Sequence, residues 1–172
     1  MTINDKIRLA PAQLQLSPRI ETLRKNARTK AASVGAELAG IVIHADLDKV
    51  SNETYDQVRD KITAQLRKNI PCDTALALSA VEMESWLMLF PAAFPKVRRG
   101  WEMRPEDCRK DLTKLANPKE HLKKHLGKPP YRESDSPTIM AAAVELGHVS
   151  ARPSGNNRSF RDFADELAGW KK

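Results

Sequence analysis

Residues 38–48 read Leu38-Ala39-Gly40-Ile41-Val42-Ile43-His44-Ala45-Asp46-Leu47-Asp48. The first eight form a near-continuous apolar run rich in β-branched side chains, which is typical of a strand covered by helices on both faces. A second apolar run, over residues 74–81, also ends in acids, Glu82 and Glu84. Between the two runs, apolar residues at helical spacing follow a Ser51-Asn52 cap. The sequence therefore predicts a β-α-β unit with two parallel strands.

Apolar residues at three- and four-residue spacing predict the other helices as well. We expect a helix over residues 18–34 that ends at Gly35, and a short buried helix over residues 84–90 with Trp86 in the core. Further helices are expected near residues 105–116, 118–126, 135–147 and 159–169, with an exposed linker over residues 150–158. The predicted fold class is α/β, a Rossmann-like, mostly parallel sheet flanked by helices and followed by a helical C-terminal part.

Length, apolar runs and cysteine spacing indicate what class of protein this is. The chain has 172 residues, enough for one domain with its own core, and no run of eighteen apolar residues that could span a membrane. It shows no secretory signal pattern at its N-terminus, and its two cysteines, Cys72 and Cys108, lack CxxC spacing. We therefore expect a cytoplasmic protein with reduced thiols.

The charge balance favours a polyanionic partner. The net charge is +7, with 29 Lys and Arg against 22 Asp and Glu, and nucleic acid is the commonest polyanion in the cell. Aromatic residues make up only 5% of the chain and do not interleave with the basic ones. If DNA or RNA is bound, we expect contacts to its phosphates more than stacking on its bases.

The acids at the strand ends suggest a metal site. Asp46 and Asp48 are spaced i, i+2 at the carboxyl end of a strand, the edge where parallel sheets place their ligands. Their oxygen atoms suit Mg²⁺ or Mn²⁺, although such acids also serve as ordinary turn and cap residues. Glu82 and Glu84 favour the metal, because four carboxylates on one edge would otherwise repel each other. Glu84 is the better ligand candidate of the two, although it could instead face a helix dipole, and Glu82 could be solvent-exposed.

Four stretches of the chain carry a resemblance to a known family. They are residues 41–48 with the DxD, residues 81–87 with a glutamate before Trp-Leu, residues 117–120 with a Pro-Lys pair, and residues 131–135 with a Tyr followed by acids. In this order they resemble an uncharacterised bacterial family of TOPRIM-like proteins, related to OLD-type nucleases. The resemblance covers roughly residues 36–147 and implies a TOPRIM-like sheet with a metal-dependent site acting on phosphodiesters. It also implies pairing with an AAA or SMC-like ATPase, as in anti-phage modules.

The family pattern assigns roles by position. Asp46, Asp48 and Glu84 would be the metal ligands, with Glu82 beside them, and Lys119 would face a phosphate. For Lys119, an ordinary place in the first turn of a basic helix is an equally good interpretation. The domain would span residues 1–149, followed by a linker and terminal helix over residues 150–172.

One departure from the TOPRIM pattern leaves catalysis open. TOPRIM domains usually begin with a strand that ends in a glutamate acting as general acid or base, and no glutamate lies upstream of residue 17. The first hypothesis is a Mg²⁺- or Mn²⁺-dependent nuclease or phosphoesterase subunit for phage defence or DNA maintenance. The alternatives are a non-catalytic partner of an ATPase and a phage accessory protein that binds nucleic acid. A homo-oligomer is also left open.

The remaining candidates are basic or histidine residues. Two groups could contact phosphates: the helical lysines Lys119, Lys123, Lys124 and Lys128, and the pair Arg98 and Arg99. His121 and His125 lie four residues apart and could share a helix face, but no third zinc ligand is evident. His44 is expected to be a hydrogen-bonded core residue, although it lies close to the DxD. No P-loop exists, so this chain is not expected to bind nucleoside triphosphates itself.

Overall fold

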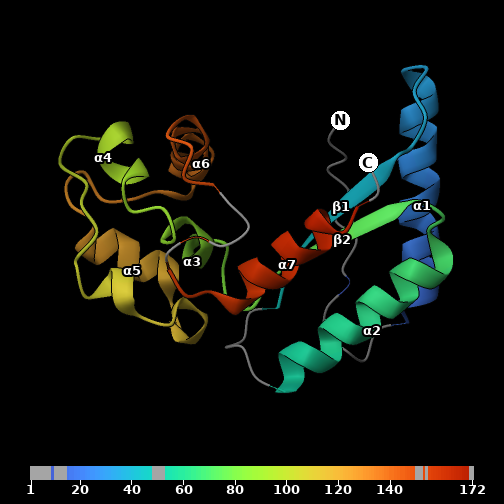
Figure 1. Ribbon diagram of the computed structural model, residues 1–172, viewed down its shortest axis with the longest axis horizontal. Helices are drawn as coiled ribbons and strands as arrows, with labels where there is room; N and C mark the ends of the chain where they lie inside the picture. Colours follow the sequence, from blue (N-terminus) through green and yellow to red (C-terminus); the bar gives the residue numbers. More distant parts are fainter. Residues whose placement is uncertain (1–8, 10–14, 48–52, 150–152, 154, 171–172) are drawn as a thin grey trace.

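The structure, a computed structural model, describes residues 9, 15–47, 53–149, 153 and 155–170. Two strands, β1 (Gly40–Asp46) and β2 (Asp73–Ser79), pair in parallel, with α2 (Glu53–Asn69) between them in the chain (Figure 1). The register joins Gly40 to Asp73 and Asp46 to Ser79. The predicted β-α-β unit is therefore confirmed, although Asp48 and the expected Ser51-Asn52 cap lie outside the described residues.

One face of this sheet packs against α2 and α1 (Leu16–Ser33). Side chains alternate along a strand, so every second residue faces the same way. Ile43, Leu76 and Leu78 point to this face and form a core with residues of the two helices, namely Leu16, Ile20, Tyr55, Val58, Ile62 and Leu66. The first helix ends as expected before Gly35, whose φ of +65° suits glycine.

The opposite face of the sheet is only half covered. Helix α7 (Arg158–Ala168) lies along β2, and the Trp170 ring covers the start of β1, where a Cβ on Gly40 would lie 2.6 Å from Trp170 Cζ3. Further along β1, the Val42 residue is 52% exposed and the His44 side chain 55%. The expectation that helices cover β1 on both faces is wrong, because α7 lies along β2 and leaves this part of β1 open. The placement of His44 in the core is wrong for the same reason.

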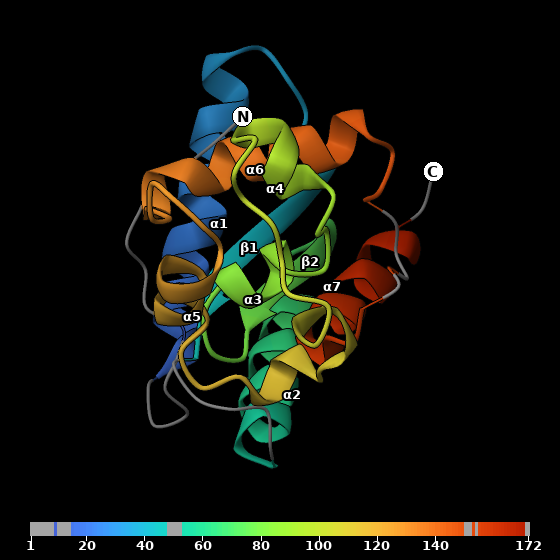
Figure 2. The same cartoon turned by 90° about the vertical axis from the view of Figure 1, so that its left-hand side faces the viewer.

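The second half of the chain forms a helical group with its own core. It contains α3 (Glu84–Leu87), α4 (Ala93–Val97), α5 (Pro118–His125) and α6 (Ser136–Glu145), together with short 3₁₀ turns (Figure 2). Its core is rich in aromatic side chains, including Trp86, Phe90, Phe94, Trp101 and Tyr131. Trp86 is 2% exposed, which confirms its predicted place in the core.

Two helix predictions in this region are wrong. Residues 105–116 form two 3₁₀ turns, Asp107–Arg109 and Leu112–Lys114, where one helix was expected. The Asp111 side chain accepts a hydrogen bond from the Thr113 N–H, and such local bonds compete with a continuous helix. The helix expected over residues 84–90 ends at Leu87, and α4 was not separately predicted.

Helix α7 contacts both the aromatic core and the sheet. At its N-terminus the Ser159 hydroxyl accepts a hydrogen bond from Trp86 Nε1 at 2.8 Å, and Asn157 Nδ2 donates to Ser85 Oγ at 3.1 Å. Asn157 also caps the helix, since its Oδ1 accepts the Phe160 N–H. The other end of α7 packs along β2, so this helix joins the aromatic core to the sheet.

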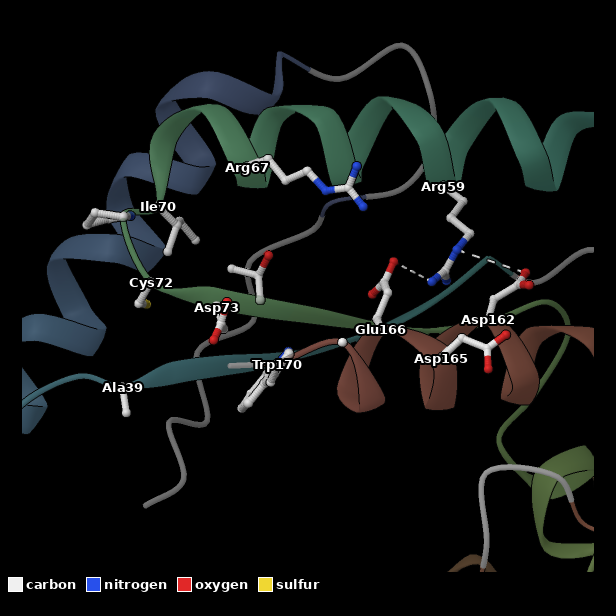
Figure 3. Close-up of a pocket in the computed structure, with 13 residues that line it drawn as sticks. Ala39, Arg59, Arg67, Ile70, Cys72, Asp73, Asp162, Asp165, Glu166 and Trp170 are labelled. Carbon is white, nitrogen blue, oxygen red and sulfur yellow. Dashed lines mark hydrogen bonds and ion pairs between the residues drawn. The ribbon is translucent and has the colours of Figure 1, made fainter. Parts of the chain in front are cut away.

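A buried ion pair satisfies the outer edge of β2. The Leu76 N–H donates to Glu166 Oε2 at 2.6 Å, and Arg59 Nη1 donates to the Leu76 carbonyl at 3.2 Å. Arg59 and Glu166 also bind each other, with Nη2 and Oε1 2.6 Å apart (Figure 3). These two side chains occupy the place where a third strand would pair. A cavity of about 1010 Å³ extends from them along the first residues of β2.

Two expectations from composition can also be compared with the structure. Among the described residues, no helix is both long enough and apolar enough to cross a membrane. Cys72 and Cys108 are both free thiols, as the sequence predicts.

We expect Glu166→Gln to lower the free energy of unfolding by about 2 kcal/mol, because it removes the closer of the two carboxylates that pair with the buried Arg59 and leaves only Asp162, 3.9 Å from Arg59 Nε. Urea denaturation followed by circular dichroism would measure the change. Glu145→Gln is the matched control, since Glu145 is exposed on α6 and should change stability by less than about 0.5 kcal/mol. Equal stabilities of the two variants would contradict the role given to this ion pair.

Candidate functional site

The carboxyl ends of β1 and β2 lie side by side, as the metal hypothesis requires. The strands are parallel neighbours, and Asp46 at the end of β1 pairs with Ser79 at the end of β2. The Asp46 side chain is 43% exposed, and its Oδ1 lies 3.3 Å from His44 Nε2. Its predicted partner Asp48 lies outside the described residues, so the Asp46–Asp48 pair stays a prediction.

Glu84 is positioned at the first residue of α3, shortly after β2 ends. The residue is 7% exposed, and its Oε1 accepts a hydrogen bond from the Tyr131 hydroxyl at 3.0 Å. The same hydroxyl lies 2.6 Å from Ser136 Oγ. Burial is the main reason that the pKa of Tyr131 is raised, so its proton stays available to Glu84. Tyr131 belongs to a motif in the sequence, but its contact with Glu84 joins distant positions and was not predicted.

Glu82 and Lys119 are brought together from segments far apart in the chain. The Lys119 N–H, in the first turn of α5, donates to Glu82 Oε2 at 2.9 Å, and Lys119 Nζ lies 4.0 Å from Glu82 Oε1. Lys119 Nζ also forms an ion pair with Glu133. The hydrogen bond to Glu133 is the main reason that the pKa of Lys119 is raised, with the charges of Glu82 and Glu84 adding to it. Lys119 is therefore a protonated amine among three carboxylates.

We call these five residues the acid–lysine cluster: Glu82, Glu84, Lys119, Tyr131 and Glu133. They come from three of the four stretches on which the family resemblance is based. Glu133 was not singled out as a site residue from the sequence, although it lies in the quoted Tyr131–Asp135 stretch. Folding places these stretches together just beyond the carboxyl end of β2.

The described donor groups near Asp46 fit Mg²⁺ or Mn²⁺ in chemistry but not in number. In the part of the chain that the structure describes, no three His, Cys, Asp or Glu side chains are grouped closely enough to hold a metal. The chemistry of the donors is nevertheless suitable, since Asp46 is a partly exposed carboxylate at the expected edge. Ser79, directly beside it in the register, has a buried hydroxyl with no hydrogen-bond partner. A buried polar atom without a partner is one sign of a site for an ion or water.

One lysine of the first predicted basic group, Lys128, lies near the second group, Arg98 and Arg99. The segment that holds Arg98 and Arg99 lies beside the segment that holds Lys128: Trp101 Nε1 donates to the Pro129 carbonyl at 2.6 Å, and Gly127 packs directly on Gly100. Arg98 lies over the Trp101 ring and pairs with Asp135. We call Arg98, Arg99, Lys123, Lys124 and Lys128 the basic surface, and all five are exposed.

His121 and His125 share a face of α5, as predicted, with ring centroids 4.8 Å apart. His121 Nε2 lies 2.8 Å from Asp107 Oδ2 and 3.2 Å from Arg104 Nη2. Burial and the nearby Arg104 charge lower the pKa of His125. Because a guanidinium already lies against the imidazole, this cluster is better explained as a structural ion-pair network than as a zinc site.

Comparison of the chain with family models, curated proteins and solved structures found no match.

The Asp107 network should make stability depend on acid pH. Burial alone would raise the pKa of Asp107, but hydrogen bonds from Arg104, Lys110 and His121 outweigh it and hold this pKa below its usual range. A depressed carboxyl pKa stabilises the folded state above the unfolded pKa of about 4, and this contribution is lost as the pH falls further.

We therefore expect Asp107→Asn to be less stable than the wild type at pH 7, by about 3 kcal/mol, and the difference to shrink toward pH 3. Urea denaturation at a series of pH values would measure it. Asp60→Asn, an exposed position on α2, is the control. A difference between Asp107→Asn and wild type that stays constant with pH would contradict this account.

Proposed function

We propose that the protein is a TOPRIM-like, metal-dependent nuclease or phosphoesterase subunit that acts on DNA or RNA. The observation that carries the proposal is the acid–lysine cluster, because three motifs separated by up to about fifty residues meet in one place. A structural role alone does not require the Pro-Lys, Tyr and glutamate motifs to converge. Their position just beyond the carboxyl end of β2 is the usual place for ligands in parallel α/β sheets.

The roles of the residues follow from their contacts. Asp46, Asp48 and Glu84 would hold Mg²⁺ or Mn²⁺, with Glu82 beside them. A bound cation of this kind supplies activation of water and neutralisation of charge on the phosphate. Tyr131 orients Glu84 through its hydroxyl, and Lys119 provides a fixed positive charge for a phosphate oxygen. The basic surface provides the charges that bind the sugar-phosphate backbone.

A second candidate is a non-catalytic partner of an AAA or SMC-like ATPase. Two observations favour it: Lys119 is already paired with Glu133, and Glu84 is almost fully buried against Tyr131. The sequence also has no glutamate upstream of residue 17 that could act as general acid or base. In this candidate the fold binds nucleic acid and the ATPase without cutting. A role in phage defence or DNA maintenance is shared by both candidates.

We expect cleavage of plasmid DNA or of RNA in the presence of Mn²⁺, measured with and without an AAA or SMC-like ATPase partner. The double variant Asp46→Asn/Asp48→Asn should reduce cleavage by more than about 100-fold, because even outer-shell partners of a metal contribute 10–100-fold. Asp60→Asn should cleave like the wild type. Cleavage that survives the double variant would disprove the metal site, and no cleavage with the ATPase present would favour the binding role.

The basic surface should determine nucleic-acid affinity. We expect Arg99→Ala/Lys128→Ala to weaken binding to DNA or RNA and to lower the slope of log affinity against log salt by about two, one for each lost phosphate contact. Fluorescence anisotropy at several salt concentrations would measure the slope. The control, Lys25→Ala/Arg28→Ala, removes two exposed charges from α1. A larger loss in that control would place the nucleic acid on α1 instead.

A further inference from the structure

The open part of β1 presents two possible ligands to solvent. His44 and Asp46 are spaced i, i+2 on one strand, so their side chains leave the same face of the sheet. Both are about half exposed, and His44 Nε2 lies 3.3 Å from Asp46 Oδ1. The two atoms form a hydrogen bond, but a longer one than the usual charge-assisted bond of about 2.7–2.9 Å. Their separation matches the spacing of two neighbouring donors around one cation with bonds of about 2.0–2.2 Å.

A third polar group on the same face is buried and has no partner. Ser79 pairs with Asp46 in the register, so both side chains leave the same face of the sheet, on strands about 4.8 Å apart. The Ser79 residue is 0% exposed, and its Oγ makes no hydrogen bond. Leaving a buried hydroxyl unpaired destabilises the folded protein. The orphaned hydroxyl is an observation independent of the His44–Asp46 contact.

We propose that His44 is a nitrogen ligand of the cation held by Asp46, and that Ser79 positions the Asp46 carboxylate by hydrogen bonding when the cation is bound. This inference rests on the metal site of the proposed function and adds its ligand set and selectivity. Mg²⁺ prefers oxygen ligands throughout, whereas imidazole favours transition metals. The site is therefore selective for Mn²⁺ over Mg²⁺, and His44 is the source of that preference.

Isothermal titration calorimetry with MnCl₂ and with MgCl₂ tests this without any substrate. We expect the wild type to bind Mn²⁺ more tightly, and His44→Gln to lose about tenfold in Mn²⁺ affinity while Mg²⁺ affinity is nearly unchanged. Ser79→Ala should weaken both ions by about tenfold, as loss of an outer-shell partner does. It should also raise the Tm of the metal-free protein, because the orphaned hydroxyl is gone. Asp46→Asn should abolish binding of both ions.

His148→Gln is the matched control, since His148 is exposed beyond the end of α6 and should leave both affinities unchanged. If Asp46→Asn abolishes binding but His44→Gln keeps the wild-type preference for Mn²⁺, His44 is not a ligand, and the metal site of the proposed function stands. If Ser79→Ala binds both ions like the wild type, the role given to Ser79 is wrong. If the wild type binds neither ion, the inference and the metal-dependent function are both overturned.

Discussion

The structure depends on how the unpaired edge of a two-stranded sheet is satisfied. Two parallel strands leave outward amides and carbonyls that a larger sheet would pair with a further strand. Here the Leu76 N–H and carbonyl bind Glu166 and Arg59, which also bind each other. Arg59 comes from α2 and Glu166 from α7, so one buried ion pair joins the connecting helix, the terminal helix and the sheet. Since α7 also contacts Trp86 through Ser159, the same helix joins the sheet to the aromatic core.

The position of α7 also determines which part of the sheet is accessible. A helix that lies along β2 leaves most of β1 open on the same face, and the open residues include His44 and Asp46. If helices covered both faces of the sheet, the Asp46 carboxylate could reach solvent only past the end of β1. In this structure the Asp46 side chain is exposed on the face of β1 that α7 does not cover. The exposed end of β1 and the acid–lysine cluster beyond β2 both lie at the carboxyl ends of the strands.

The sequence predicted the helices and strands that local patterns determine, but it did not predict the exposure and long-range contacts that tertiary packing determines. Apolar runs and helical spacing identified β1, β2, α1, α2, α5, α6 and α7 within a few residues, and the order of elements identified the parallel pair. The pattern could not show that α7 leaves Val42 and His44 uncovered, because an apolar run looks the same whether one face or two are buried. It also could not show the Lys119–Glu133 and Tyr131–Glu84 contacts, which join positions 14 and 47 residues apart. The 3₁₀ turns over residues 107–114 were missed because Asp side chains bind local groups there.

The hydrogen bonds of Glu84 bear on whether the site can be catalytic. The Tyr131 hydroxyl donates its single proton to Glu84 Oε1, so it accepts the hydrogen bond from Ser136 Oγ. Such a chain polarises each bond in turn and fixes the carboxylate in one orientation. Because Oε1 is held, Oε2 is the oxygen left for another partner, which suits a ligand that binds through one atom. The Tyr131 contact therefore does not prevent Glu84 from serving as a ligand, but it would limit Glu84 to a single oxygen, and it holds this nearly buried carboxylate in place.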